Sequence, residues 1–349
     1  MTDKLKNILR YSVSAAVAVI LLYACFRNVR WADFTSALES CRWGFVVLSM
    51  AVGVLSFWLR AIRWRMLLGP VDPSISRRVC FNSVNIGYLA NLVLPRAGEF
   101  VRCGFITKAS EKGPDGHRRA SYDKVIGTVV LERAWDTLTM LLCLCLVLAS
   151  TWKRFGGFFK ENVIGQALGS MSVPWLLVSM AAAASLGLCL VWALRERVGL
   201  FGRIWKIVRG IWEGVVSCLH MESGWMFIVL TVGIWACYWM TAASIIWAVQ
   251  GIGDGAGTMD PSVVSALGSM GLVDALFLMT VGSVSSLVPV PGGFGAYHYL
   301  VSLALLSVYG IPMPVGIVFA TLSHESQALM QMVCGLWGYF SETFKKQIL

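Results

Sequence analysis

One apolar stretch of this chain, residues 79–95 (VCFNSVNIGYLANLVLP), can enter a lipid bilayer but is not expected to cross it. Basic residues flank it on both sides: Arg60, Arg63, Arg65, Arg77 and Arg78 upstream, and Arg96, Arg102, Lys108, Lys112, Arg118, Arg119 and Lys124 downstream. Because loops rich in lysine and arginine stay on the cytoplasmic side, both flanks are predicted to lie on that side. The chain is therefore expected to turn back inside the membrane.

The turn is predicted at Pro95 and Gly98, and the returning limb 96–107 (RAGEFVRCGFIT) is too short and too charged to span. Non-helical backbone survives at membrane depth only where protein buries it or where it lines a watery cavity. Residues 79–107 are thus predicted to form a re-entrant element that marks a site for something polar.

The composition is that of a polytopic membrane protein. Hydrophobic residues make up 57% of the 349 residues and charged residues 14%, against about 25% charged in soluble domains. The longest polar interval, 107–125, has the length of a loop, so we expect residues 1–349 to form a single all-α membrane domain. We attribute the net charge of +10 to the positive-inside bias rather than to nucleic-acid binding.

We predict about six full spans, with the amino-terminal run retained as a span and both termini in the cytoplasm: 8–26, 43–59, 126–150, 174–194, 224–249 and 317–340. A second broken element covers 262–309, where two apolar limbs flank residues 289–295 (PVPGGFG). Each limb is expected to be long enough to cross, and the charges do not decide whether this element turns at mid-membrane or crosses fully.

The two halves of the chain match in order. Residues 1–165 and 166–349 are each predicted to hold two spans, a broken element (79–107 or 262–309) and a further span. The first half starts inside and the second starts outside, which describes an inverted-topology repeat. Such repeats are typical of transporters whose substrate site lies between the halves at mid-membrane.

Charged residues inside the predicted spans are candidate site residues, because each costs at least about 2.5–3.5 kcal/mol to insert. Glu132, Arg133 and Asp136 lie at helical spacings i,i+3 and i,i+4 within one span, so they can share one region of a helix. They are interpreted either as lining a cavity or as a structural ion pair near the cytoplasmic end.

At the first break, Pro95, Arg96, Glu99 and Arg102 place two cations around one carboxylate. Guanidinium groups suit bidentate contacts with phosphate, so Arg96 is favoured as a binding residue, while Arg102 fits binding and positive-inside anchoring equally well. Three amides add polar lining, namely Asn82, Asn85 and Asn91, and Asn85 fits a helix-packing contact equally well.

In the second half, the break residues Pro291, Gly292 and Gly293 accompany four polar residues in otherwise uncharged spans: Asp274, which is expected near the middle of an apolar limb, His298, His324 and Glu325. These residues are interpreted as a relay for protons or lipid headgroups, or the histidines as core residues whose hydrogen bonds are satisfied within the protein. The histidines are far apart in sequence and no CxxC occurs, so no metal site, disulfide framework or cofactor is predicted.

Three motifs carry a resemblance to a known family: residues 91–102 (NLVLPRAGEFVR), 131–136 (LERAWD) and 289–295 (PVPGGFG). With these motifs the chain resembles the transmembrane flippase region of bacterial lysylphosphatidylglycerol synthases, a family that also occurs without a synthase domain. The resemblance covers nearly the whole chain. It implies translocation of a polar lipid between leaflets, and a location in the bacterial inner membrane.

The chain departs from that family at two positions. The family usually carries a glutamate where this chain has His298, and an arginine where it has Glu325. If the two positions face each other, the pair is kept with its polarity reversed, which puts lysylphosphatidylglycerol itself in doubt as the substrate. The aminoacyl-transferase domain is also absent, so we expect no lipid synthesis. We expect no other enzymatic activity, because the sequence offers no His/Asp cluster with metal spacing and its acids are paired with arginines.

The sequence thus predicts a flippase for a polar or charged phospholipid or glycolipid. Arg96, Arg102 and Arg133 would hold an anionic headgroup, and Glu99, Glu132 and Asp136 would orient these arginines or bind a cationic group. Two other interpretations stay open. The chain could be a non-transporting membrane partner of a lipid-modifying glycosyltransferase, or an enzyme that acts on lipid phosphates.

Overall fold

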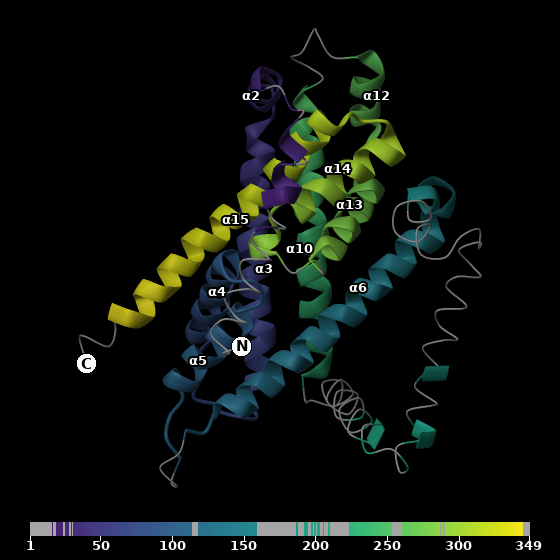
Figure 1. Ribbon diagram of the computed structural model, residues 1–349. Helices are drawn as coiled ribbons and strands as arrows, with labels where there is room; N and C mark the ends of the chain where they lie inside the picture. Colours follow the sequence, from purple (N-terminus) through teal and green to yellow (C-terminus); the bar gives the residue numbers. More distant parts are fainter. Residues whose placement is uncertain are drawn as a thin grey trace. The chain divides into compact units, whose positions relative to one another are not determined.

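The computed structural model describes residues 31–113, 118–158, 223–252 and 260–344 except 287 and 289, with short pieces before residue 30 and between 186 and 209. These residues form helices and no strand: α2 (Trp31–Glu39), α3 (Trp43–Leu68), α4 (Arg77–Val93), α5 (Gly98–Ala109), α6 (Tyr122–Phe158), α10 (Gly224–Val249), α12 (Pro261–Ser269), α13 (Leu272–Ser285), the 3-10 turn η2 (Pro291–Gly293), α14 (Ala296–Tyr309) and α15 (Met313–Phe344) (Figure 1). The all-α prediction is confirmed for this part of the chain. The predicted spans 8–26 and 174–194 fall largely outside it.

The chain divides into two compact units, which are described separately. The larger unit joins Met1–Val129 to Ile228–Leu349, and the smaller one is Val130–Phe227. The larger unit holds both broken elements and is the setting for most of the candidate site.

Two of the described helices are long and apolar enough to cross a membrane, namely α3 and α10 with 26 residues each. The predicted span 224–249 has the same bounds as α10. A third candidate is the pair α12 and α13, whose axes bend by 92° at the break between them. Long helices α6 and α15 also cover the predicted spans 126–150 and 317–340, and both carry charged residues.

Helix α3 corrects the prediction that the second span ends at residue 59. The helix continues to Leu68 and carries Arg60, Arg63 and Arg65 within it. The side chains of Arg60 and Arg63 are 4% and 0% exposed. These two arginines are therefore buried in the helical bundle, and they do not belong to a flanking cytoplasmic loop.

The second broken element also differs from its prediction. Its first limb was expected to be long enough to cross, and α12 and α13 together have that length, but an unpredicted kink divides the limb: α12 ends at Ser269 and α13 begins at Leu272. Carbonyl groups around the kink accept hydrogen bonds from Trp239 in α10 and from Gln250, the residue that follows α10. Gln250 Nε2 donates to the carbonyl oxygens of Leu267 and Met270 at 3.0 Å, and Trp239 Nε1 donates to that of Leu272 at 2.7 Å.

Helix α4 of the first half packs closely against α15 of the second half. The contact depends on glycine. A Cβ atom at Gly335 would lie 2.5 Å from Leu89 Cβ and 2.8 Å from the Asn85 carbonyl oxygen, and one at Gly338 would lie 3.0 Å from the Asn82 carbonyl oxygen. Small residues let two helix backbones approach in this way, and they are typical of helix pairs in membranes.

Gly335→Ala is expected to lower the stability of the protein by about 1–3 kcal/mol, because the added methyl group would push α15 away from the α4 backbone. Thermal unfolding in detergent, followed by tryptophan fluorescence, measures the effect. The matched control is Gly104→Ala in α5, where no atom lies within 4 Å of the new Cβ. Equal melting temperatures for the two variants would contradict the packing argument.

The connection between α3 and α4 is held by a buried carboxylate, Asp72. Ser74 donates to it from its amide at 3.0 Å and from its hydroxyl at 2.6 Å, and the Ser110 hydroxyl donates from the loop after α5 at 2.5 Å. Burial acts to raise the pKa of Asp72, but these hydrogen bonds, together with the nearby charge of Arg119, hold it below the ordinary value of 3.8.

Asp72→Asn is expected to destabilise the protein by about 1–3 kcal/mol at neutral pH, because the hydroxyl groups lose a charged acceptor. A carboxylate whose pKa is lowered on folding stabilises the fold above its unfolded pKa and loses that effect as the pH falls through its folded pKa. The difference between wild type and variant should be constant above about pH 5 and shrink below about pH 4. Denaturation of both proteins across this range tests the prediction, and a difference that does not change with pH would contradict it.

Candidate functional site

The first break lies where it was predicted, between the end of α4 at Val93 and the start of α5 at Gly98. Arg96 occupies the left-handed region with φ of 60°, and no other described residue except glycine has positive φ. The Asn91 side chain closes the turn, since its Oδ1 atom accepts a hydrogen bond from the Gly98 amide at 2.7 Å. Backbone strain of this kind is typical of functional sites.

Helices α4 and α5 cross at a pair of glycines next to this break. A Cβ atom at Gly87 would lie 2.9 Å from the Gly98 carbonyl oxygen and 3.4 Å from Arg102 Cβ. The guanidinium carbon of Arg102 lies 4.5 Å from the centre of the Trp64 ring, and the residue is 3% exposed. The crossing therefore places a buried arginine against an aromatic face, where a cation–π contact stabilises it.

Two further buried arginines were missed as candidate site residues. Arg60 Nη2 donates to the Tyr238 hydroxyl at 2.9 Å, and Arg63 Nη1 donates to Thr231 Oγ1 at 3.2 Å, both across to α10. The sequence signal that could have identified these two arginines is their i,i+3 spacing within an apolar run. It was interpreted as a positive-inside flank because a cluster of arginines after a span usually marks the cytoplasmic end.

The amide side chains of α4 have structural partners. Asn85 is fully buried and its Nδ2 atom donates to the Phe81 carbonyl oxygen at 2.8 Å, while its backbone faces Gly335 of α15. Asn82 Nδ2 donates to Glu342 Oε1 at 2.6 Å. The Asn85 side chain thus bonds within its own helix and its backbone meets α15, so both interpretations of this residue stay predictions.

The second break is built on glycines that adopt positive φ. Gly292, Gly293 and Gly295 have φ of 57°, 81° and 81°, a region that residues with a Cβ atom rarely adopt. Phe294 lies between them and packs edge-on against the ring of His324, with ring centres 4.9 Å apart. Pro291 begins the η2 turn, and Pro289 lies outside the described residues.

Residues of α14 and α15 converge beside this turn. His298 Nε2 lies 3.3 Å from Glu325 Oε1, and His324 Nδ1 lies 3.2 Å from the same oxygen. The other nitrogen of His324, Nε2, lies 2.8 Å from the Gly292 carbonyl oxygen. His298 and Glu325 therefore face each other, which is the condition under which the charged pair of the family is kept with reversed polarity. His324 contacts the same carboxylate oxygen.

The two breaks meet in the larger unit. The η2 turn packs against α4, and a Cβ atom at Gly292 would lie 3.3 Å from Leu92 Cδ2. Two segments about 200 residues apart, each a break in an apolar element, thus share one neighbourhood. No sequence spacing predicted this contact.

Asp274 does not lie where it was expected. It stands in the first turn of α13 instead of the middle of an apolar limb. Its Oδ2 atom accepts from the Gly271 amide at 2.7 Å and its Oδ1 atom from the Tyr309 hydroxyl at 2.8 Å. A carboxylate in this position caps the helix start and ties α13 to α14.

The smaller unit carries the acidic and basic triplet of α6. Arg133 Nη1 lies 3.9 Å from Asp136 Oδ2, so the predicted i,i+3 pair forms, and Glu132 is fully buried. The ion-pair interpretation agrees with this contact, and the cavity-lining interpretation stays a prediction.

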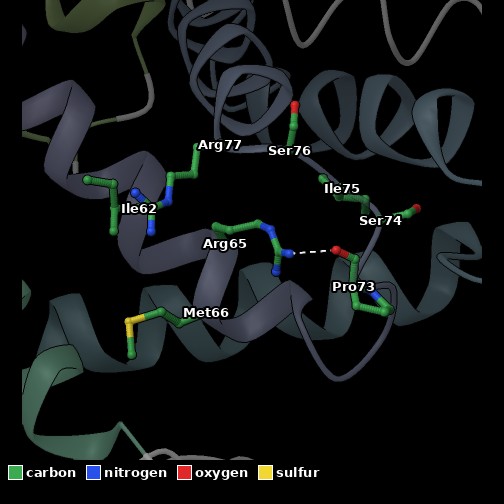
Figure 2. A pocket seen from close by; sticks show the side chains of 8 residues that line it. All are labelled: Ile62, Arg65, Met66, Pro73, Ser74, Ile75, Ser76 and Arg77. Atoms are coloured by element: carbon green, nitrogen blue, oxygen red, sulfur yellow. Dashed lines mark hydrogen bonds between the residues drawn. The ribbon is translucent and has the colours of Figure 1, made fainter.

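A pocket of about 470 Å³ opens at the start of α4, at the other end of that helix from the first break. Figure 2 shows its lining of Ile62, Arg65, Met66 and residues 73–77, with Arg65 donating to the Pro73 carbonyl oxygen at 2.7 Å. Arg65 and Arg77 supply positive charge and no acid lines the pocket. It suits an anion, but it is separate from the breaks.

Comparisons with known proteins agree with the resemblance seen in the motifs. Residues 7–335 match the family described as the lysylphosphatidylglycerol synthase TM region. A UPF0104 membrane protein of Pyrococcus horikoshii is 30% identical over 105 residues, which is 29% of this chain and 29% of that protein. The match therefore spans less than a third of that relative. No solved structure matches the chain.

Arg96→Gly is expected to be more stable than Arg96→Ala by about 1 kcal/mol, because glycine adopts positive φ without the steric cost that alanine keeps. Both variants lose the guanidinium group, so their difference isolates the backbone. Thermal unfolding of the two purified variants measures it. If Arg96→Ala is at least as stable as Arg96→Gly, the left-handed conformation at this break is not the native one.

Proposed function

Since this chain belongs to the family of the lysylphosphatidylglycerol synthase TM region, we propose that it moves a lipid with an anionic headgroup between the leaflets of the membrane. The observation that carries the proposal is the meeting of the two breaks in a bundle that buries arginines. The substrate class would be a phospholipid or a glycolipid with a phosphate or carboxylate group.

Burial of arginine side chains in a membrane protein carries a free-energy cost, so the burial of these arginines calls for a functional explanation. Arg60, Arg63 and Arg102 are at most 4% exposed and lie in or beside helices with a membrane composition. Each charge at the centre of a bilayer costs about 2.5–3.5 kcal/mol on insertion scales. A path for an anionic headgroup accounts for this cost, because a polar route through the bilayer needs fixed positive charge along it.

The helix lengths favour re-entrant elements on both sides of the path. Helices α5, α13 and α14 have 12, 14 and 14 residues, fewer than the minimum of about 17 that a spanning helix needs. Each predicted half contributes one broken element, 79–107 or 262–309. This arrangement supports an inverted repeat with both termini in the cytoplasm and a site at mid-membrane, as in other transporters.

Within this proposal, the residues of the first break have separate roles. Arg96 is exposed at the turn and would receive the headgroup, and the buried Arg102 would hold it at the crossing of α4 and α5. Glu99 would orient these guanidinium groups. Arg133 on α6 stays a candidate for a further contact, with Glu132 and Asp136 beside it.

Reconstitution into liposomes tests the proposal. Fluorescent phosphatidylglycerol, phosphatidylethanolamine and a glycolipid are placed in both leaflets, and quenching from outside measures how fast the inner pool becomes accessible. Arg102→Gln is expected to slow transport of the anionic lipid by about tenfold or more, because a charged hydrogen bond contributes about 1.5–3 kcal/mol. Arg96→Ala should act in the same direction.

The matched control is Lys108→Gln, which removes an exposed cation from the same helix as Arg102 and should leave the rate within about twofold. Folding of each variant is checked by its elution and melting temperature. Wild-type protein that moves none of the three lipids would overturn the proposal and favour a non-transporting partner of a lipid-modifying enzyme. Metal-dependent turnover of a lipid phosphate would favour an enzyme instead.

A further inference from the structure

The three side chains beside the second break form a ligand set for a metal ion. His298, His324 and Glu325 each offer one ligand atom, and these atoms all lie within 4.8 Å of one another. His298 is 1% exposed, so the set is anchored inside the bundle. Two imidazoles and one carboxylate are the protein ligands of many zinc sites that keep a fourth position open.

The separations between the ligand atoms fit such a site. Bonds of about 2.0–2.2 Å at tetrahedral angles place two ligand atoms about 3.3 Å apart. The structure has 3.3 Å between His298 Nε2 and Glu325 Oε1, and 3.2 Å between His324 Nδ1 and the same oxygen. A cation that sits between these atoms would need little movement of either helix.

A hydrogen bond outside the ligand set fixes the orientation of one imidazole. The Gly292 carbonyl oxygen can only accept, so His324 Nε2, at 2.8 Å, must carry the proton and donate it. In a neutral imidazole this leaves the lone pair of Nδ1 directed at Glu325 Oε1. Metal-bound histidines commonly have such a partner on the other nitrogen, because it sets both the tautomer and the ring orientation.

The cluster therefore needs positive charge at its centre, and the chain supplies little nearby in sequence. No lysine or arginine occurs between Arg209 and Lys345. A carboxylate oxygen and the lone pair of an imidazole nitrogen repel each other at this distance unless a proton or a cation lies between them. A divalent cation satisfies all three at once and uses the lone pair of His324 Nδ1 directly.

We infer that His298, His324 and Glu325 bind a divalent transition-metal ion of the zinc class, with at least one coordination position left for water or an anionic ligand. The ion joins α14 to α15 and, through His324 and Gly292, holds the η2 turn. This inference does not rest on lipid transport, since it follows from the ligand set alone.

The test uses the full-length protein with an affinity tag that contains no histidine. The protein is stripped with a chelator, loaded with Zn²⁺, desalted and analysed by mass spectrometry of its metal content. Wild type is expected to retain about one zinc ion per chain, and His324→Gln and Glu325→Gln should bind zinc about 100-fold more weakly. His117→Gln removes a histidine outside the described residues and serves as the control.

Cobalt(II) loading identifies the ligands, because the ten cysteines could also bind zinc. A tetrahedral site of nitrogen and oxygen ligands gives visible absorption without the near-ultraviolet band that thiolate ligation adds. Glu325 has a side chain 40% exposed, so Glu325→Gln is the variant that best keeps the fold should a histidine variant fail. Zinc should also raise the melting temperature of wild type but not of Glu325→Gln.

Equal zinc retention by wild type and the Glu325→Gln variant, or a thiolate band in the cobalt spectrum, would overturn the inference. So would wild type that retains no zinc. Arg102→Gln separates this inference from the proposed function, because it is expected to slow lipid transport and still retain zinc.

Discussion

The close packing of α4 against α15 is the contact on which the arrangement of the candidate site depends. Gly335 lets the α15 backbone approach the carbonyl groups of α4 at a distance that a Cβ atom would prevent, and Gly338 adds a second close approach. Because α4 leads into the first break and α15 carries His324, this contact joins the two predicted halves, together with the contacts that α3 makes with α15 and α10. The η2 turn can then lie against α4 near Leu92.

A second constraint acts at every break, since polar backbone groups inside a bilayer must find partners within the protein. In each case a side chain from outside the broken segment, or from its own turn, supplies the partner. Asn91 accepts from the amide that opens α5, Gln250 donates to the carbonyl groups at the kink after α12, and His324 donates to the η2 turn. Each break is therefore stabilised by specific hydrogen bonds to its backbone groups.

Much of this could be predicted from the sequence, because proline, glycine and charge are local signals. They placed the first break at Pro95 and Gly98, the second around residues 291–295, and the bounds of α10. Three features could not be found in this way. Arg60 and Arg63 follow an apolar run, where the sequence does not distinguish buried arginines from arginines that flank a span on the cytoplasmic side. The kink between α12 and α13 contains no proline that would signal it. The third is the His298–Glu325 contact, which joins residues from different helices.

The two breaks offer different chemistry to a headgroup that passes between them. Three guanidinium groups are buried in α3 and α5, while residues 210–344, which include the second break with its imidazole and carboxylate groups, contain no lysine or arginine. The lysylphosphatidylglycerol synthase family, which this chain resembles, usually has an arginine at the position of Glu325 and a glutamate at the position of His298. In this chain both positions carry other residues, and the two side chains still contact each other. The second break therefore lacks the fixed positive charge of an arginine but keeps the contact. Under the proposed function, the buried arginines of α3 and α5 offer permanent positive charge to an anionic headgroup. At the second break, attraction for it depends on a cation that the histidine and glutamate side chains hold.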